Sequence, residues 1–233
     1  MKISFVIPAQ NEEAYVGDCI DSIKTSLPLD TSEYEIIVVN NDSSDHTKSV
    51  AEAHGAYVVD EKIHGTSRAR ESGAERAHGE WVAFVDADCR LHKKWYDTFL
   101  KLKMKNENAV SFSGPYRYYD GNIFKKYLLY ALWWLSAPLM YRFVGYMILG
   151  GNFVVKKEAL QKVGGFNTSI TFYGDDTDAA RKLSAVGKVV FSMGFFTLSS
   201  MRRFNKHGIF KTNFLYILNF IWPVIFKKPF SNS

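Results

Sequence analysis

The sequence predicts an α/β fold in which a mostly parallel sheet is covered by helices on both faces. Short runs rich in Val and Ile alternate with segments whose apolar residues recur at helical spacing, and this alternation is typical of βαβ units. The 233 residues fit one sizeable domain, and a hydrophobic share of 47% is sufficient for an ordinary core. No internal repeat or low-complexity tract in the sequence favours another architecture.

The first half of the chain has the more regular pattern. Its predicted strands are residues 2–8, 35–39, 56–59 and 81–85. Between them lie predicted helices at residues 16–23, 45–55 and about 67–77. The apolar residues Val16, Cys19, Ile20 and Ile23 follow helical spacing, and Gly55 is a typical helix end. Residues 1–110 are therefore expected to form one half of the domain.

The second half is less regular and more aromatic. Strands are expected at residues 109–119, 153–155 and 189–198, and helices from 156 to about 163 and at 175–186. Pro138 and Arg142 are expected to interrupt the apolar stretch 124–149, and Gly150 and Gly151 mark a turn. Residues 111–200 complete the domain, and 201–233 are expected to form a basic, aromatic helical tail.

Charge and cysteine content narrow the class of protein only slightly. A net charge of +5 suits phosphate-bearing ligands or anionic lipids, but it equally fits an ordinary surface. Cys19 and Cys89 lack the spacing of a zinc site and are too few for a disulfide scaffold. The chain shows no signal-peptide pattern, so a cytoplasmic location is expected.

Acidic residues follow two of the apolar runs. Asp86 and Asp88 end the strand-like VDAD segment, where ligands of open α/β sheets collect. Carboxylates spaced in this way suit a magnesium or manganese ion bound to substrate phosphates, although two solvated aspartates are the simpler alternative. The GDDTD segment at 174–178 offers a candidate base, although a helix N-terminus also favours acidic residues.

Polar and basic residues elsewhere are candidates for nucleotide and phosphate contacts. The segments PAQNEE (8–13) and NNDSSDHT (40–47) follow predicted strands, so both are expected at the same rim as Asp86. Part of the second segment also serves as turn and capping residues. Arg68, Arg70, Arg202 and Arg203 have side chains suited to phosphate, although about half of such residues simply face solvent.

Five segments in order resemble the family-two inverting glycosyltransferases with the GT-A fold. They are VIPAQNEE, VVNNDSSDHT, RARESGAERAHGEWVAFVDAD, GGNFVVKKEALQKVGGF and GDDTDAARKL, and the resemblance covers roughly residues 1–200. It implies transfer of a sugar from a UDP- or GDP-sugar to an acceptor hydroxyl, with inversion and a divalent cation, Mn²⁺ or Mg²⁺. In place of the QxxRW motif of processive members the chain has MRRF at 201–204, which implies a single transfer per encounter.

The resemblance also implies roles for individual residues. Asp86 and Asp88 form the DxD pair, with Asp88 the direct metal ligand; Asp176 is the general base and Asp175 its neighbour. The donor site comprises Pro8, Gln10, Glu12, Asn41, Arg68, Arg70, Asp86 and Ala87. The acceptor loop comprises Gly150, Gly151 and Asn152. Asn41 stands where the family has an aspartate, so the base of the nucleotide is left open.

The apolar segments at 128–141 and 209–226 suggest a membrane surface. The first is apolar for about 14 residues, fewer than the roughly 18–20 that a spanning helix needs, and the second is interrupted by Lys211, Asn213, Asn219 and Pro223. Both are expected to lie in the interface at the inner face of the cell membrane or to pack on each other. A lipid-linked acceptor would fit the first arrangement.

Other functions fit the sequence less well than this resemblance does. A nucleotidyltransferase would need a Gly-rich basic loop in place of PAQNEE, and a Rossmann dehydrogenase would need GxGxxG, which is absent from the sequence. The basic residues form no recognisable module for nucleic-acid binding. A non-catalytic sugar- or nucleotide-binding protein remains the alternative, and the presence of Asp86, Asp88 and Asp176 argues against it.

Overall fold

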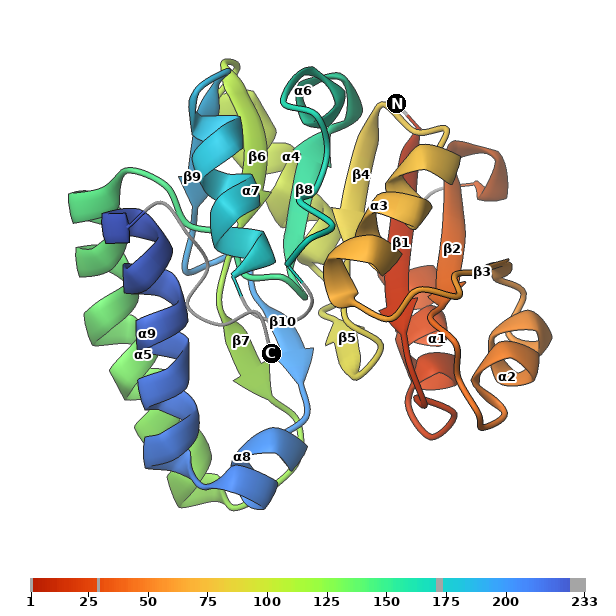
Figure 1. Ribbon diagram of the computed structural model, residues 1–233, viewed down its shortest axis with the longest axis horizontal. Helices are drawn as coiled ribbons and strands as arrows, with labels where there is room; N and C mark the ends of the chain where they lie inside the picture. Colours follow the sequence, from red (N-terminus) through yellow and green to blue (C-terminus); the bar gives the residue numbers. More distant parts are fainter. Residues whose placement is uncertain (1, 29, 171–173, 227–233) are drawn as a thin grey trace.

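The computed structural model describes residues 2–28, 30–170 and 174–226 and has the predicted α/β architecture (Figure 1). Among these residues, seven strands form the main sheet in the order β3-β2-β1-β4-β8-β6-β9. Their bounds are β1 Ile3–Ala9, β2 Tyr34–Asn40, β3 Tyr57–Asp60, β4 Trp81–Phe84, β6 Ala109–Ser113, β8 Phe153–Lys156 and β9 Lys188–Phe191. Only β8 runs antiparallel to its neighbours, so the sheet is mostly parallel as predicted.

Helices cover both faces of this sheet. One face carries α1 (Val16–Ser26), α2 (Thr47–Ala53) and α4 (Trp95–Lys105). The other carries α3 (Thr66–Arg76), α6 (Lys157–Lys162) and α7 (Asp175–Ser184). The predicted helical spacing in α1 is confirmed, because Val16, Cys19, Ile20 and Ile23 are all fully buried. A short 3₁₀ turn, Thr31–Glu33, precedes β2.

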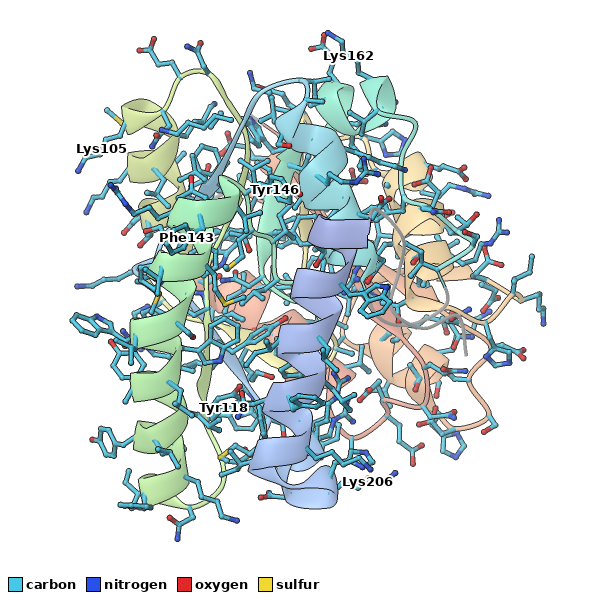
Figure 2. The ribbon with its side chains drawn as sticks, turned by 60° about the vertical axis from the view of Figure 1, so that its left-hand side comes forward. Lys105, Tyr118, Phe143, Tyr146, Lys162 and Lys206 are labelled. Carbon is cyan, nitrogen blue, oxygen red and sulfur yellow. The ribbon has the colours of Figure 1, made fainter. Side chains whose placement is uncertain are left out.

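A three-stranded sheet and three helices complete the described chain. The small sheet has the order β5-β10-β7, with β5 Cys89–Leu91, β7 Tyr116–Tyr118 and β10 Thr197–Ser199. The helices are α5 Ile123–Val144, α8 Arg202–His207 and α9 Ile209–Phe226. Figures 1 and 2 show α5 and α9 side by side at one edge of the molecule, joined to the rest through β7, β10 and α8.

Two strand predictions were wrong in the same way. The segment 109–119 is divided between β6 in the main sheet and β7 in the small sheet, and 189–198 is divided between β9 and β10. The break in the first segment falls at Gly114 and Pro115, where a Cβ on Gly114 would overlap the backbone oxygen of Phe195. Proline has no amide hydrogen to continue a ladder, so the chain leaves one sheet and enters the other.

The predicted interruption of the apolar segment by Pro138 and Arg142 was also wrong. Helix α5 runs unbroken through both residues, from an Asn122 side chain that accepts the amide hydrogen of Phe124 at 2.9 Å to Gly145 at φ 82°. Pro138 is exposed, so water can hydrogen-bond the carbonyl that loses its partner. In the described part of the chain, no helix has the length and apolar character that crossing a bilayer requires. Lys227 and Lys228, which flank the tail in the sequence, lie outside the described residues.

Candidate active site

The predicted site residues meet at one rim of the main sheet. The parallel strands β1, β2 and β4 end at this rim. Because β8 is antiparallel to β4, with Phe153 opposite Phe84, the loop before β8 lies at the same rim. A cavity of about 1580 Å³ opens there. The predicted residues that line it are Pro8, Gln10, Glu12, Asn41, Arg70, Asp86, Ala87, Asp88, Gly150, Asp175 and Asp176.

Arg202 connects two of the carboxylates on one side of the cavity. Its Nε atom donates to Asp88 Oδ2 at 2.9 Å, and its two terminal nitrogens donate to the two carboxylate oxygens of Glu12. Burial raises the pKa of Asp88, as does the nearby charge of Asp86, while Arg202 lowers it. The pKa of Glu12 is also raised, chiefly by burial. The arginine therefore offsets a concentration of negative charge that the site would otherwise hold.

Arg70 connects a second pair of carboxylates. It donates to Asp86 Oδ1 at 3.0 Å and to Asp175 Oδ2, and the side chains of Arg70 and Asp175 are each only 4% exposed. Arg70 comes from α3 and Asp175 from the first turn of α7, so this ion pair ties two helices to the end of β4. Three structural elements are held together by one buried guanidinium.

Asp176 belongs to neither set of ion pairs and accepts hydrogen bonds from the backbone. Its Oδ2 accepts the amide hydrogen of Gly150 at 3.2 Å, and its Oδ1 accepts that of Thr177 at 2.7 Å. Burial and the adjacent charge of Asp175 raise the pKa of Asp176 to about 6, against the lowering effect of Arg70. A carboxylate with a pKa near neutrality is suited to accept a proton from a hydroxyl group.

Three predicted residues do not line the cavity. Asn152 is fully buried, and its side chain bonds Trp95 and the backbone oxygens of Gly114 and Phe195. Gly151 packs against Asp86, whose Oδ2 lies 2.5 Å from where a Cβ would be. Arg68 is not among the lining residues. Asn152 and Gly151 therefore position the loop, and Gly150 alone of the three glycine-loop residues faces the cavity.

The side chain of Asn41 is fully engaged with the backbone. Its Nδ2 donates to the oxygens of Glu61 and Ile63, and its Oδ1 accepts the amide hydrogen of Gly65. Asn41 thus holds the 61–65 segment against the cavity, which the same segment lines through His64 and Gly65. Gln10 lies in contact with His64 at this end of the cavity.

Asp86 and Asp88 have the donor atoms for a divalent cation that also binds phosphate. Asp86 Oδ2 has no hydrogen bond within the described chain, whereas Asp88 Oδ1 has only a weak thiol contact at 3.8 Å from Cys89. The described residues contain no group of three acidic, histidine or cysteine side chains that would hold a metal unaided. Magnesium commonly binds one or two carboxylates and completes its shell with water and phosphate oxygens, so the pair fits a cation shared with a ligand.

The sequence left two contributors to the site unassigned. Arg202 stood out only as one basic residue among several, because nothing local to it indicates contact with Glu12, 190 positions away. Tyr116 lines the cavity and accepts the amide hydrogen of Gly151 at 2.7 Å. It lay inside a segment expected to be one continuous strand, which gave no reason to place its hydroxyl at the site.

Comparison with known proteins gives a family match and two groups of named relatives. The model of the family "Glycosyl transferase family 2" matches residues 4–164, well over half of the chain. Glycosyltransferase AglE of Haloferax volcanii is 34% identical over 101 residues, which are 41% of this chain and 33% of that protein. The 4,4'-diaponeurosporenoate glycosyltransferase of Staphylococcus aureus is 34% identical over 132 residues, 51% of this chain and 34% of that protein. The chain spans about a third of the length of these curated relatives.

Solved structures show the same fold at low sequence identity. The mannosyltransferase PcManGT of Pyrobaculum calidifontis, in complex with GDP-Man and Mn²⁺, has a TM-score of 0.74 and 17% identity and covers 96% of this chain and 64% of its own. S. aureus TarS has a TM-score of 0.66 and 16% identity, covering 94% and 66%. These likenesses confirm the predicted GT-A fold. The family match over residues 4–164 shows that the chain belongs to glycosyl transferase family 2.

Proposed function

We propose that this protein transfers a sugar from a nucleoside-diphosphate sugar to an acceptor hydroxyl, with inversion at the anomeric carbon. The observation that carries the proposal is the meeting of Asp86, Asp88 and Asp176 in one cavity with the loop residue Gly150. Family membership supports the class of reaction, and relatives in the family are named as glycosyltransferases. PcManGT binds GDP-Man and Mn²⁺, and TarS binds UDP-GlcNAc.

The chemistry assigned to each residue follows from its surroundings. Asp176 accepts the proton of the acceptor hydroxyl as that oxygen attacks the anomeric carbon, and the nucleoside diphosphate leaves from the opposite side. Arg70 and Asp175 keep Asp176 in place through the ion pair that joins α3 to α7. A divalent cation held by Asp86 and Asp88 would offset the charge that develops on the leaving diphosphate.

Donor binding is tested with the Asp88→Asn variant. We expect the wild-type protein to bind UDP or GDP in calorimetry only when Mn²⁺ or Mg²⁺ is present, and the variant to lose that metal-dependent binding. Asp97→Asn is the matched control, because Asp97 is an exposed aspartate on α4 that does not line the cavity. Metal-dependent binding that survives in Asp88→Asn would remove Asp88 as a metal ligand.

The role of the base is tested with Asp176→Asn. This variant should bind the nucleotide normally but release nucleoside diphosphate from the donor at least about a hundredfold more slowly, the usual range for losing a general base. Asp178→Asn serves as control, since Asp178 lies in the same helical turn, pairs with Arg181 and does not line the cavity. Retained turnover in Asp176→Asn would refute the assignment and favour the non-catalytic alternative.

We also propose that α5 rests on an anionic membrane surface. Its outer stripe of Ile123, Tyr127, Tyr130 and Trp134 is 36–67% exposed. Lys125 and Lys126 stand in its first turn, and Arg142 in its last. Interfacial helices combine aromatic and apolar residues with flanking cations in this way. Co-sedimentation with vesicles of anionic phospholipid should fall for Trp134→Glu and not for Tyr57→Glu, a variant of an exposed tyrosine on β3. Equal co-sedimentation of both variants would rule out this surface.

A further inference from the structure

The cavity does not end at the carboxylates but continues between α5 and α9. Its volume of about 1580 Å³ exceeds the roughly 300–1,000 Å³ typical of a single small-molecule site. The far part is lined by Leu128, Leu132 and Leu135 of α5 and by Phe214 and Ile217 of α9. There is therefore room for a second ligand beside a nucleotide sugar.

The walls of this extension are apolar yet open to solvent. Leu135 is 72% exposed and Phe214 is 61% exposed, although both line the cavity. Each square ångström of apolar surface that a ligand removes from water contributes about 25 cal/mol. An apolar chain lying between the two helices would cover side chains that the protein itself leaves uncovered.

The base of the groove is formed by packed side chains. Leu129 of α5 is fully buried against Phe204 of α8, with Tyr118 of β7 packed beside them. Figure 2 shows Tyr118 between α5 and α9, Lys206 near the α8 end and Phe143 toward the far end of α5. The groove therefore has a packed floor where α5 meets α8.

The helices α5, α8 and α9 carry basic residues and no acidic ones, although Asp120 accepts hydrogen bonds from Ser200 and Met201 at the start of α8. No Asp or Glu occurs in residues 121–157 or 179–233, which include α5, α8 and α9. Lys206, His207 and Lys211 are exposed and line the cavity where α8 meets α9. An anionic group at this end would lie close to cations while the apolar groove continues beyond it.

We infer that the groove between α5 and α9 binds the acceptor, and that the acceptor is an amphiphile with an anionic, hydroxyl-bearing headgroup on an isoprenoid or acyl chain. The inference rests on the proposed transferase function and names its acceptor class. The headgroup lies at Lys206, His207 and Lys211, and the chain lies between α5 and α9. In the transfer, the acceptor oxygen bonds the anomeric carbon as the carbon–oxygen bond to the diphosphate breaks. The diphosphate takes the electron pair, and Asp176 takes the hydroxyl proton.

Binding of farnesyl diphosphate to the whole protein tests the groove without knowledge of the sugar. The titration contains saturating UDP or GDP with Mn²⁺, so that the probe does not report on the donor site. We expect farnesyl diphosphate to bind at least about tenfold more tightly than inorganic pyrophosphate, because its chain covers apolar surface. It should also bind at least about tenfold more tightly than farnesol, because its diphosphate meets the cations. If inorganic pyrophosphate or farnesol bound as tightly as farnesyl diphosphate, the inference of an amphiphilic acceptor would be overturned.

Two variants of α5 test where the farnesyl group binds. Leu135→Glu places a charge in the groove and should weaken farnesyl diphosphate binding about tenfold. Leu139→Glu is the matched control, since Leu139 is 55% exposed on α5 but does not line the cavity, and it should change the affinity by less than about twofold. Lys206→Ala should weaken farnesyl diphosphate and leave farnesol unchanged. If the two leucine variants changed the affinity for farnesyl diphosphate equally, the farnesyl group would bind outside this groove.

The outcomes separate this inference from the proposed function. A protein that binds UDP or GDP with metal but not farnesyl diphosphate retains the transferase proposal and loses the amphiphilic acceptor. A protein that binds farnesyl diphosphate but no nucleotide under any condition loses the transferase proposal, and the groove is then a lipid-binding site of another kind.

Discussion

Two arginines pair with two carboxylates each in the candidate site, and they do so in contrasting surroundings. Arg70 lies within the α/β domain and is 4% exposed, as is its partner Asp175. Arg202 belongs to the helical part at the edge and is 38% exposed, with partners Glu12 at 14% and Asp88 at 16%. The first arginine joins three elements of the core, and the second joins α8 to the rim of the sheet.

The difference in burial assigns different tasks to the two arginines. A buried ion pair that loses one member leaves a charge in a poorly solvated place, whereas an exposed pair is screened by water and salt. Arg70 is therefore a permanent part of the scaffold around Asp176. Arg202 occupies carboxylates that a divalent cation would also use, and its guanidinium can pair with a diphosphate instead, so it can exchange partners when a ligand arrives.

The largest expected effect is the loss of stability in Arg70→Met. The variant leaves Asp175 buried without its cation, so the free energy of unfolding should fall by about 3–5 kcal/mol. Arg202→Met removes a more exposed cation but leaves Glu12 and Asp88 at 14% and 16% exposure, so the loss should be smaller, about 1–2 kcal/mol. Urea denaturation of the two variants measures both values. Losses of similar size would mean that the contrast in burial has no energetic consequence.

The second prediction concerns the pH dependence of transfer. Because burial and the charge of Asp175 raise the pKa of Asp176 to about 6, the base is protonated below that pH. The rate should fall as the pH drops through about 6, by roughly tenfold for each further unit. Asp175→Asn removes the adjacent negative charge and frees Arg70 to face Asp176, so both changes lower the pKa of Asp176.

The measurement is the pH–rate profile of two variants, one from each arginine's pair of carboxylates. Asp175→Asn should shift the fall in rate to lower pH. Glu12 pairs with Arg202, so Glu12→Gln should leave the pH at which the rate falls unchanged, even if the maximum rate changes. A profile that moves with Glu12→Gln and not with Asp175→Asn would assign the titration to the other side of the cavity.

The sheet rim and Arg202 also differ in how far the sequence could predict them. Asp86 and the segments 8–13 and 40–47 follow apolar runs whose strands belong to one sheet, so local patterns were enough to predict that they meet at one rim. Gly150 was assigned to the site only through the family resemblance. Arg202 reaches Glu12 only through the path of the chain after β10, which no local pattern specifies. The division of 109–119 between two sheets escaped prediction for a similar reason, because the close approach of Gly114 to Phe195 is a tertiary contact.

Asn41 and Asn152 show a further limit of prediction from motifs. Both were assigned to ligands because the family resemblance places residues at these positions in the donor site and the acceptor loop. The structure engages the side-chain amides of both with the protein itself. Residue type and sequence position predicted where these residues lie, but only the three-dimensional arrangement determines whether a buried amide faces a ligand or holds a loop.

The smallest expected effect is on cation binding in Arg202→Met. Without the guanidinium, Glu12 and Asp88 lose their cationic partner and attract a divalent ion more strongly, so the affinity for Mn²⁺ in the absence of nucleotide should rise several-fold. Arg76→Met is the control, since Arg76 is an exposed arginine in the last turn of α3 that does not line the cavity. Calorimetric titration with MnCl₂ compares the two variants with the wild-type protein. Unchanged or weaker Mn²⁺ binding in Arg202→Met would show that Arg202 does not compete with the cation, and the two arginines would then differ in burial alone.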